Sequence, residues 1–392
     1  MILRILFLLI ILLLLPVWGI DRLILKKSWK LLPRLLFCVP NLVLLLSLVV
    51  VAVNESYTLD AALLKGRLLT ATLCLVIPET VIVLGLLCLY MLRKKEKLHR
   101  FLVRIVFLFG SVVFAMLLYG FTLGYQHIVV RESSYQSAAV PKSFDGYKIV
   151  QLTDFHLGTL HGHQSLVRTI VERVNALQPD LIVFTGDLVN YQAEELLEFE
   201  DILSAFQAPD GVISVMGNHD YMTYHKWSSE QERLSNVSLL QEHQRAIGWK
   251  LLLNEHTLIR KGDDSIAVLG VENDGRPPFP SLGDLSKAQE GLSSACFKIL
   301  LSHDPSHWRR KVLPETDIPL MLSGHTHGMQ FKIGSFSPAA WFYPEWGGTY
   351  TEEGQTLQVS LGVGSVMLPF RLGAWPEIHL ITLRSEDYQV EQ

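Results

Sequence analysis

The chain has 392 residues, of which 49% are hydrophobic and only 18% are charged. Soluble domains carry about 25% charged residues, so this composition excludes a protein built only of soluble domains, and its apolar content excludes a disordered one. The net charge of −4 combines two unlike parts. Residues 1–130 hold 14 Lys and Arg against 5 Asp and Glu, whereas residues 131–392 hold 20 against 33. We therefore expect two different kinds of structure on the two sides of residue 130.

Four apolar runs precede residue 125, and we expect each to form a transmembrane helix. They are 5–20, 35–53, 68–92 and 105–124. A helix needs about 20 apolar residues to cross the hydrocarbon core, so the last three qualify by length. The first run is short enough for a signal peptide, but no small-residue cleavage site follows it. Glu79 within the third run is either a functional carboxylate or, as we favour, a protonated one hydrogen-bonded among the helices.

The loops between these runs predict how the chain crosses the membrane. Residues 21–34 and 93–100 each contain five Lys or Arg, whereas residues 54–67 contain two, together with Glu55 and Asp60. Basic loops stay on the cytoplasmic side. We therefore expect a multi-pass cell membrane protein with everything after residue 124 outside the cytoplasm.

The remaining chain reads as a linker followed by one large domain. Residues 125–144 are mostly polar without a helical period, and residues 145–392 suffice for a single core. Within the domain, short apolar strands end abruptly in polar clusters; we expect strands at 147–152, 181–184, 212–216, 299–301 and 320–322. Amphipathic helices are expected at 166–177 and 194–206, between the first three strands. This β-α-β-α-β order predicts an α/β fold with parallel strands, whose carboxyl ends gather ligands.

Seven side chains with metal-binding atoms follow these strands. They are Asp154, His156, Asp187, Asn218, His303, His325 and His327. Each cluster alone would be explained as well by a cap, a turn or a buried histidine. Together, carboxylate, amide and imidazole groups without a thiolate suit Mn, Fe or Zn. Seven ligands exceed one site, so the pattern predicts two divalent ions about 3.5–4 Å apart that share a carboxylate.

The order of these motifs resembles the calcineurin-like metallophosphoesterases. The motifs are Asp154-x-His156, Gly186-Asp187, Gly217-Asn218-His219-Asp220, His303 and Gly324-His325-Thr326-His327. Residues 270–274 and 371–378 are similar to a membrane-associated bacterial subgroup. The resemblance covers about residues 146–385 and implies a four-layer α/β/β/α sandwich.

The resemblance also implies a role for each residue of the motifs. Asp154, His156 and His327 would hold one metal, Asn218, His303 and His325 the other, and Asp187 would bridge them. His219 would stabilise the transferred phosphoryl group or protonate the leaving oxygen, and Asp220 would orient His219. A hydroxide bridging the two ions would attack the phosphorus.

The predicted function is that of a membrane-anchored, metal-dependent phosphatase or related hydrolase. It would cleave a phosphomonoester, phosphodiester or pyrophosphate, with a lipid-linked substrate favoured by the anchor. Nucleic acid is not expected, because a domain with a net charge of −13 lacks the basic surface that a phosphate backbone needs. The alternative is a non-enzymatic membrane sensor or scaffold that kept the fold. An aromatic cluster at 341–346 has two explanations, packing or contact with substrate or bilayer.

Overall fold

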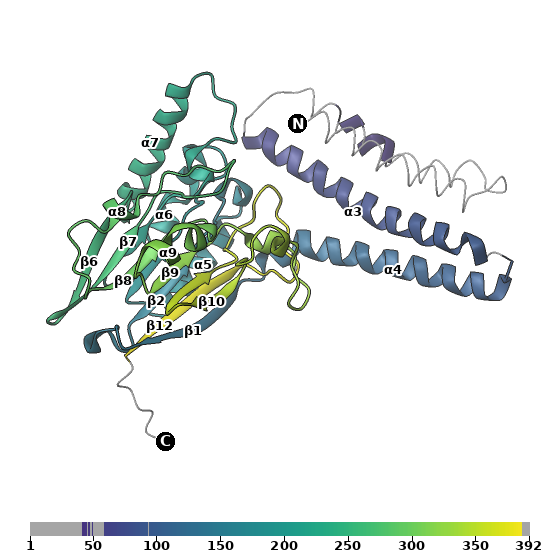
Figure 1. Ribbon diagram of the computed structural model, residues 1–392. Helices are drawn as coiled ribbons and strands as arrows, with labels where there is room; N and C mark the ends of the chain where they lie inside the picture. Colours follow the sequence, from purple (N-terminus) through teal and green to yellow (C-terminus); the bar gives the residue numbers. More distant parts are fainter. Residues whose placement is uncertain (1–40, 45, 48, 50–58, 93, 386–392) are drawn as a thin grey trace. The chain divides into compact units, whose positions relative to one another are not determined.

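The computed structural model describes residues 41–44, 46, 47, 49, 59–92 and 94–385. The chain divides into two compact units, Met1–Thr122 and Leu123–Gln392 (Figure 1). The first predicted membrane helix lies outside the described residues, as does most of the second. Among the described residues, two helices are long and apolar enough to span a membrane, Leu64–Leu92 and Glu96–Gln126.

The described part of the first unit consists mainly of two long helices, α3 (Leu59–Leu89) and α4 (Glu96–Thr122). They approach closely at glycines: a Cβ on Gly110 would lie 2.5 Å from Cγ1 of Ile82. Small residues at such contacts are typical of helices that associate in membranes. Glu79 accepts a hydrogen bond of 3.3 Å from the Asn41 amide. This contact agrees with the favoured explanation of Glu79 as a carboxyl that is hydrogen-bonded among the helices.

The second unit contains two mixed sheets of six strands each. The first has the order β1 (Val129–Ser137), β12 (Glu377–Ser385), β2 (Lys148–Leu152), β3 (Leu181–Phe184), β4 (Val212–Ser214), β5 (Trp249–Leu251). Strands β2, β3 and β4 are parallel, as the β-α-β-α-β pattern predicts. The strand β5, which was not predicted, runs parallel to β4, and β12 runs antiparallel to β2. The second has the order β10 (Gly348–Glu352), β11 (Gln355–Val359), β9 (Leu320–Ser323), β8 (Phe297–Leu301), β7 (Asp264–Gly270), β6 (Glu255–Lys261).

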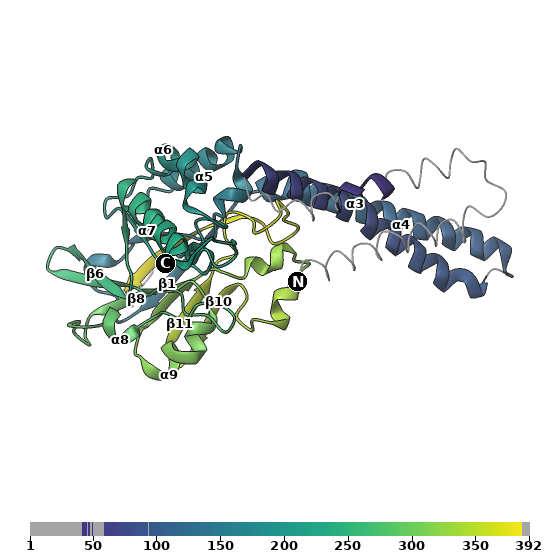
Figure 2. The same cartoon turned by 90° about the horizontal axis from the view of Figure 1, so that it is seen from above.

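Apolar side chains from the two sheets meet in one buried cluster, in which Ile149 and Val183 of the first sheet join Val268 and Leu301 of the second. A second cluster packs the helices α5 (Gln164–Ala176), α6 (Glu200–Leu203) and α7 (Glu230–Ala246) against the first sheet. A third packs α8 (Leu285–Ala288) and the π-helix Trp308–Val312, which continues into α9 (Leu313–Glu315), against the second sheet (Figure 2). The strands that carry the predicted ligands are therefore held in buried, packed positions.

Two predicted segments differ from the structure. The expected linker 125–144 contains β1, which pairs in parallel with β12 over its whole length. The polar composition of this segment suggested a linker, but it belongs to an edge strand, β1, whose side chains are mostly exposed. The expected helix 194–206 is instead a 3-10 helix, Ala193–Phe199, followed by the short α6. Its buried apolar residues are Ala193, Leu196 and Phe199, and a spacing of three is the period of a 3-10 helix.

Candidate metal centre

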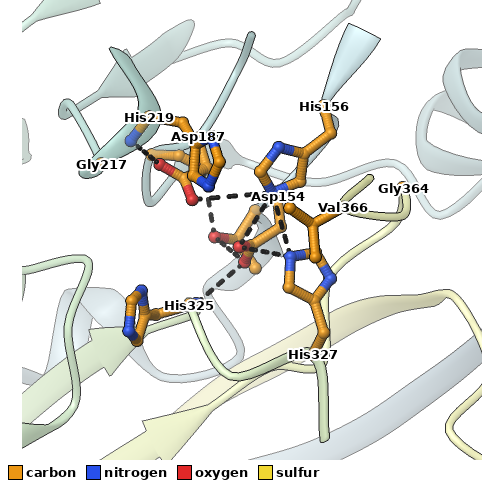
Figure 3. Close-up of polar contacts among 12 residues, drawn as sticks. Asp154, His156, Asp187, Gly217, His219, His325, His327, Gly364 and Val366 are labelled. Atoms are coloured by element: carbon orange, nitrogen blue, oxygen red, sulfur yellow. Dashed lines mark hydrogen bonds and ion pairs between the residues drawn. The ribbon is translucent and has the colours of Figure 1, made fainter. Parts of the chain in front are cut away.

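The predicted ligands follow the ends of five strands, as the sequence pattern indicates. They come after β2, β3 and β4 in the first sheet and after β8 and β9 in the second. Asp154, His156 and His327 lie together, and we call them the first ligand group (Figure 3). Nε2 of His327 lies 3.0 Å from Nε2 of His156 and 3.1 Å from Oδ1 of Asp154. Three atoms that could bind a metal ion therefore lie close together.

Asn218, His303 and His325 form the second ligand group. Nδ1 of His325 lies 2.8 Å from Oδ1 of Asn218 and 3.3 Å from Nε2 of His303. Nδ1 of His303 lies 2.8 Å from the carbonyl oxygen of Thr185, a contact that sets the tautomer and directs Nε2 into the site.

Asp187 lies between the two groups. Its Oδ2 is 3.1 Å from Nε2 of His303 and 3.6 Å from Nε2 of His156. Its Oδ1 accepts a hydrogen bond of 2.8 Å from the backbone N–H of His219. One carboxylate oxygen thus faces ligands of both groups, which is the placement that a bridging ligand requires.

The backbone at the site adopts an uncommon conformation. Five of the predicted ligands have positive φ: Asp154, His156, Asp187, His325 and His327. Non-glycine residues adopt this region at a cost and do so mainly at functional sites. Neighbouring glycines allow the close approach, since a Cβ on Gly217 would lie 2.2 Å from Oδ1 of Asp187 and one on Gly324 would lie 2.3 Å from Oδ2 of Asp154.

The electrostatics of the site fit divalent cations. Burial lowers the pKa of both His156 and His327, so their imidazoles stay neutral, as metal ligands must. Burial alone would raise the pKa of Asp154, but the imidazoles of His327 and His156 hold it well below its ordinary value. Burial would likewise lower the pKa of His303, but the Asp187 carboxylate raises it to about 10, so this imidazole would have to release a proton on binding a metal. Oδ1 of Asp154 is buried and accepts no hydrogen bond. These anionic, partly unsatisfied atoms suit a positive ion.

The structure corrects the role expected for Asp220. Its carboxylate accepts hydrogen bonds from the backbone N–H groups of Asp187, Leu188, Val189 and Gly217. Nδ1 of His219 lies instead 2.9 Å from the carbonyl oxygen of Asn190. Asp220 therefore braces the loop that carries Asp187, and the Asn190 carbonyl orients His219.

Two tyrosines in contact with the second ligand group were not assigned from the sequence. The hydroxyl of Tyr343 lies 2.7 Å from Nε2 of His325, and the hydroxyl of Tyr224 accepts a hydrogen bond of 2.9 Å from the Asn218 amide. The ring of Tyr224 also lies 4.3 Å, centre to centre, from that of His219. Tyr343 belongs to the aromatic cluster 341–346 that the sequence singles out, but nothing in that cluster indicates which ring reaches a ligand.

Two buried charged residues support the first ligand group. Arg371 is fully buried, and its guanidinium lies 2.9 Å from Nδ1 of His327. It also donates hydrogen bonds to backbone carbonyl oxygens, among them that of Leu361 at 2.8 Å. The carboxylate of Glu195 accepts hydrogen bonds from the backbone N–H groups of Gly158, Asn190 and Tyr191.

A pocket of about 560 Å³ opens at the cluster. Its polar wall includes Asp187, Asn218, His219 and ligand histidines. The rest of the lining is mostly apolar and carries a single Arg; it consists of Arg276, Pro277, Pro278, Phe279, Thr326, Met329, Ala339, Phe342, Tyr343 and Val366. The size suits a small molecule with a polar head and an apolar body.

Comparison with known proteins gives the same result as the motifs. Residues 147–329 match the sequence model of a family described as calcineurin-like phosphoesterase. A Bacillus subtilis (strain 168) protein named uncharacterized metallophosphoesterase YkuE is 32% identical over 298 residues, which are 71% of this chain and 95% of that protein. A Danio rerio protein named transmembrane protein with metallophosphoesterase domain is 31% identical over 253 residues, which are 62% of this chain and 55% of that protein.

The matches extend to a further bacterial protein, from Campylobacter jejuni, named uncharacterized metallophosphoesterase Cj0846, which is 28% identical and covers 62% of this chain. The chain spans little more than half the length of the Danio rerio relative but nearly the whole of the Bacillus one. The resemblance that the motifs indicated is therefore confirmed, and the chain belongs to the calcineurin-like phosphoesterase family.

Proposed function

We propose that this protein is a membrane-anchored phosphoesterase that works with two divalent metal ions. The observation that carries the proposal is Asp187, whose Oδ2 faces His156 of the first ligand group and His303 of the second. The first group would hold one ion, the second group the other, and Asp187 would touch both. Mn, Fe and Zn suit this mixture of carboxylate, amide and imidazole ligands.

Bound at these ligands, two divalent ions would lower the pKa of a water molecule and neutralise the charge of a phosphate group. The chain's own residues would orient the substrate. Nδ1 of His219 donates to the Asn190 carbonyl, which leaves Nε2 as the nitrogen that meets a phosphoryl oxygen. Arg276 adds a positive charge to the pocket lining. This supports cleavage of a phosphomonoester, phosphodiester or pyrophosphate.

The membrane anchor is part of the proposal. The two helices that suit a bilayer, Leu64–Leu92 and Glu96–Gln126, support it, as does the name of the Danio rerio relative. The connection between them is rich in Lys and Arg, which favours the cytoplasmic side. We infer that the unit after Thr122 is extracytoplasmic and that α3 and α4 belong to a larger set of membrane helices. The expected four-layer order of the second unit is likewise inferred, supported by its three buried clusters.

Hydrolysis by the full chain purified in detergent tests the function. We expect Mn, Fe or Zn to support cleavage of p-nitrophenyl phosphate or its bis-ester, and Asp187→Asn to reduce turnover at least about a hundredfold. Asp263→Asn, at an exposed turn, is the matched control and should retain full turnover. No hydrolysis by the wild type with any of these metals, or unchanged hydrolysis by Asp187→Asn, would reject the proposal.

A further inference from the structure

Six large apolar side chains are exposed around the mouth of the pocket, on the loops between β9 and β10 and after β11. They are Met329, Ile333, Phe336, Trp341, Phe342 and Met367, with exposed fractions from 45% for Phe336 to 72% for Trp341. We call this set the apolar rim. Met329 and Phe342 also line the pocket, so the rim continues into the site. A soluble protein rarely leaves such side chains together without a partner.

Contacts between the loops make the rim one surface. The backbone N–H of Lys332 donates to the carbonyl of Leu372 at 2.8 Å, and the rings of Phe336 and Trp341 lie 5.8 Å apart. The Val366 N–H donates to the side chain of Gln330 at 2.7 Å. Figures 1 and 2 both show these loops gathered at the end of the second unit away from the β6–β7 hairpin.

Residues 124–127, which follow the last long apolar helix, lie beside the same surface. The helix α4 ends at Thr122, and Gly124 packs so tightly against Arg371 that a Cβ would lie 2.0 Å from the Arg371 carbonyl oxygen. Next along the chain, the ring of His127 lies 5.0 Å from that of Trp375. Residues 371–375 adjoin the loop of Lys332 and Ile333 through Leu372. The first residues of the second unit therefore lie beside the apolar rim.

The two stretches of chain that carry the apolar rim differ from the rest of the second unit in their content of Asp and Glu. Residues 131–392 contain 33 Asp and Glu, yet none lies in residues 318–344 or 354–376, the two stretches that carry the rim. Lys332 lies in one of those stretches, and the segment 97–131 that leads into the unit also lacks acidic residues. Two stretches without carboxylates add no repulsion from anionic lipid headgroups, unlike the rest of a domain with a net charge of −13.

Building on the membrane-anchored phosphoesterase proposed above, we propose that the apolar rim enters the lipid–water interface of the bilayer. The pocket then opens onto the membrane surface, and its substrate is a phosphoester of a lipid that stays in that surface. Exposed Trp, Phe, Met and Ile side chains are those that gain from burial at the boundary of headgroups and acyl chains. Met329 and Phe342 would receive the first apolar part of the lipid, while its phosphate reaches the ligand groups.

Fluorescence quenching tests insertion without knowledge of the substrate. A fluorophore is attached to Trp341→Cys in a full chain whose four native cysteines are replaced by Ala, reconstituted in vesicles of phosphatidylcholine and phosphatidylserine. Lipids with a spin label at the shallow end of an acyl chain should remove most of its fluorescence. The same label at Leu258→Cys, an exposed Leu on β6 at the other end of the unit, is the control and should be little affected. Equal quenching at the two positions overturns the proposal.

Turnover tests the substrate class. In the same vesicles, the wild type should hydrolyse at least one of phosphatidic acid, phosphatidylglycerol and a polyprenyl pyrophosphate. Trp341→Ser should lower that rate about tenfold, as expected for loss of one buried aromatic anchor, and leave hydrolysis of the soluble bis-ester unchanged. Leu258→Ser should change neither rate. If the wild type cleaves the bis-ester but none of the lipids, the substrate class is wrong and the phosphoesterase stands; if it cleaves nothing, the proposed function itself fails.

Discussion

The two ligand groups of the candidate metal centre are similar in composition but are supported in different ways. The first group rests on buried charges: the guanidinium of Arg371 contacts His327, and the Glu195 carboxylate fixes the N–H groups of Gly158 and Asn190 next to His156. These charged side chains hold several backbone segments at once. The first group is therefore part of what holds the fold together.

The second group rests on neutral atoms near the pocket. The tyrosine hydroxyls of Tyr343 and Tyr224 contact His325 and Asn218, and Tyr224 is 43% exposed. Among the described residues, these hydroxyls bond to ligand side chains alone. We therefore expect substitutions that remove the support of the first group to lower the stability of the protein. Substitutions around the second group should lower its metal affinity and leave the protein folded.

Arg371→Met should produce the largest stability loss. The substitution leaves the carbonyl oxygens of Leu361, Gly364 and Ala374 buried without a donor, so we expect the unfolding free energy to fall by roughly 3–5 kcal/mol. Chemical denaturation of the purified chain measures it. Arg260→Met, an exposed Arg on β6, is the control. A loss no greater than in the control would show that Arg371 does not hold these loops.

The pH dependence of stability should show the buried charge of Glu195. Burial raises its pKa to about 7, against an ordinary value of 4.5, despite the backbone N–H groups that favour ionisation. The folded state therefore holds this proton more tightly, so its stabilisation is complete below pH 4.5 and is lost as the pH rises through about 7. The whole effect is at most about 3 kcal/mol.

Comparison with Glu195→Gln isolates this contribution, because the amide does not titrate. The unfolding free energy of the wild type relative to the variant should be greatest at pH 4.5 and below and should shrink towards pH 8. Denaturation curves at several pH values, recorded in the same detergent, measure it. A difference that stays constant with pH would mean that Glu195 is ionised throughout, and the first group would then rest on a permanent anion.

Tyr343→Phe should affect the metal without affecting the fold. Loss of the hydroxyl removes the contact with Nε2 of His325, so we expect the affinity for the second ion to fall about tenfold, within the range usual for groups that orient a ligand. Metal titration followed by turnover of the bis-ester measures it. Tyr350→Phe, whose hydroxyl contacts only backbone atoms of Gly347, is the matched control. A loss of stability comparable to that of Arg371→Met would remove the contrast between the groups.

Tyr224→Phe should have the smallest effect. The ring that packs against His219 is kept, and only the hydrogen bond from the Asn218 amide is lost. Because this half-exposed position admits water as a replacement acceptor, we expect the metal affinity to fall by less than about tenfold and the unfolding free energy to change by less than about 0.5 kcal/mol. A larger effect than that of Tyr343→Phe would reverse the order of the two tyrosines.

Local patterns predicted the strands that carry the ligands. The apolar runs ending at Asp154, Asp187 and His325 correspond to β2, β3 and β9, because the end of a buried strand is visible in its own residues. The strand β1 was missed because it has no such pattern: its pairing partner β12 lies some 240 residues away, and its exposed face is polar.

The sequence also predicted which residues could bind metal, but it did not predict which residues support them. Spacing placed His325 and His327 after one strand, but Arg371 and Tyr343 reach them from loops whose course depends on tertiary packing. Asp220 shows the same limit. Because Asp220 follows His219 in the sequence, we expected the two side chains to interact. The Asp220 carboxylate instead accepts hydrogen bonds from backbone N–H groups of the loop that carries Asp187. Whether these groups bind metal remains a prediction that titration will test.

The position of β12 in the first sheet bears on how the protein is made. This strand lies between β1, which follows the last long apolar helix, and β2, which carries Asp154 to its place. Residues 377–385 leave the ribosome long after both neighbours, so β1 stays separate from the rest of its sheet, and β2 lacks one neighbour, during most of synthesis. The backbone around Asp154 is completed only when β12 is added, because Glu377 bonds to Gly362 and the neighbouring Val363 bonds to Thr153.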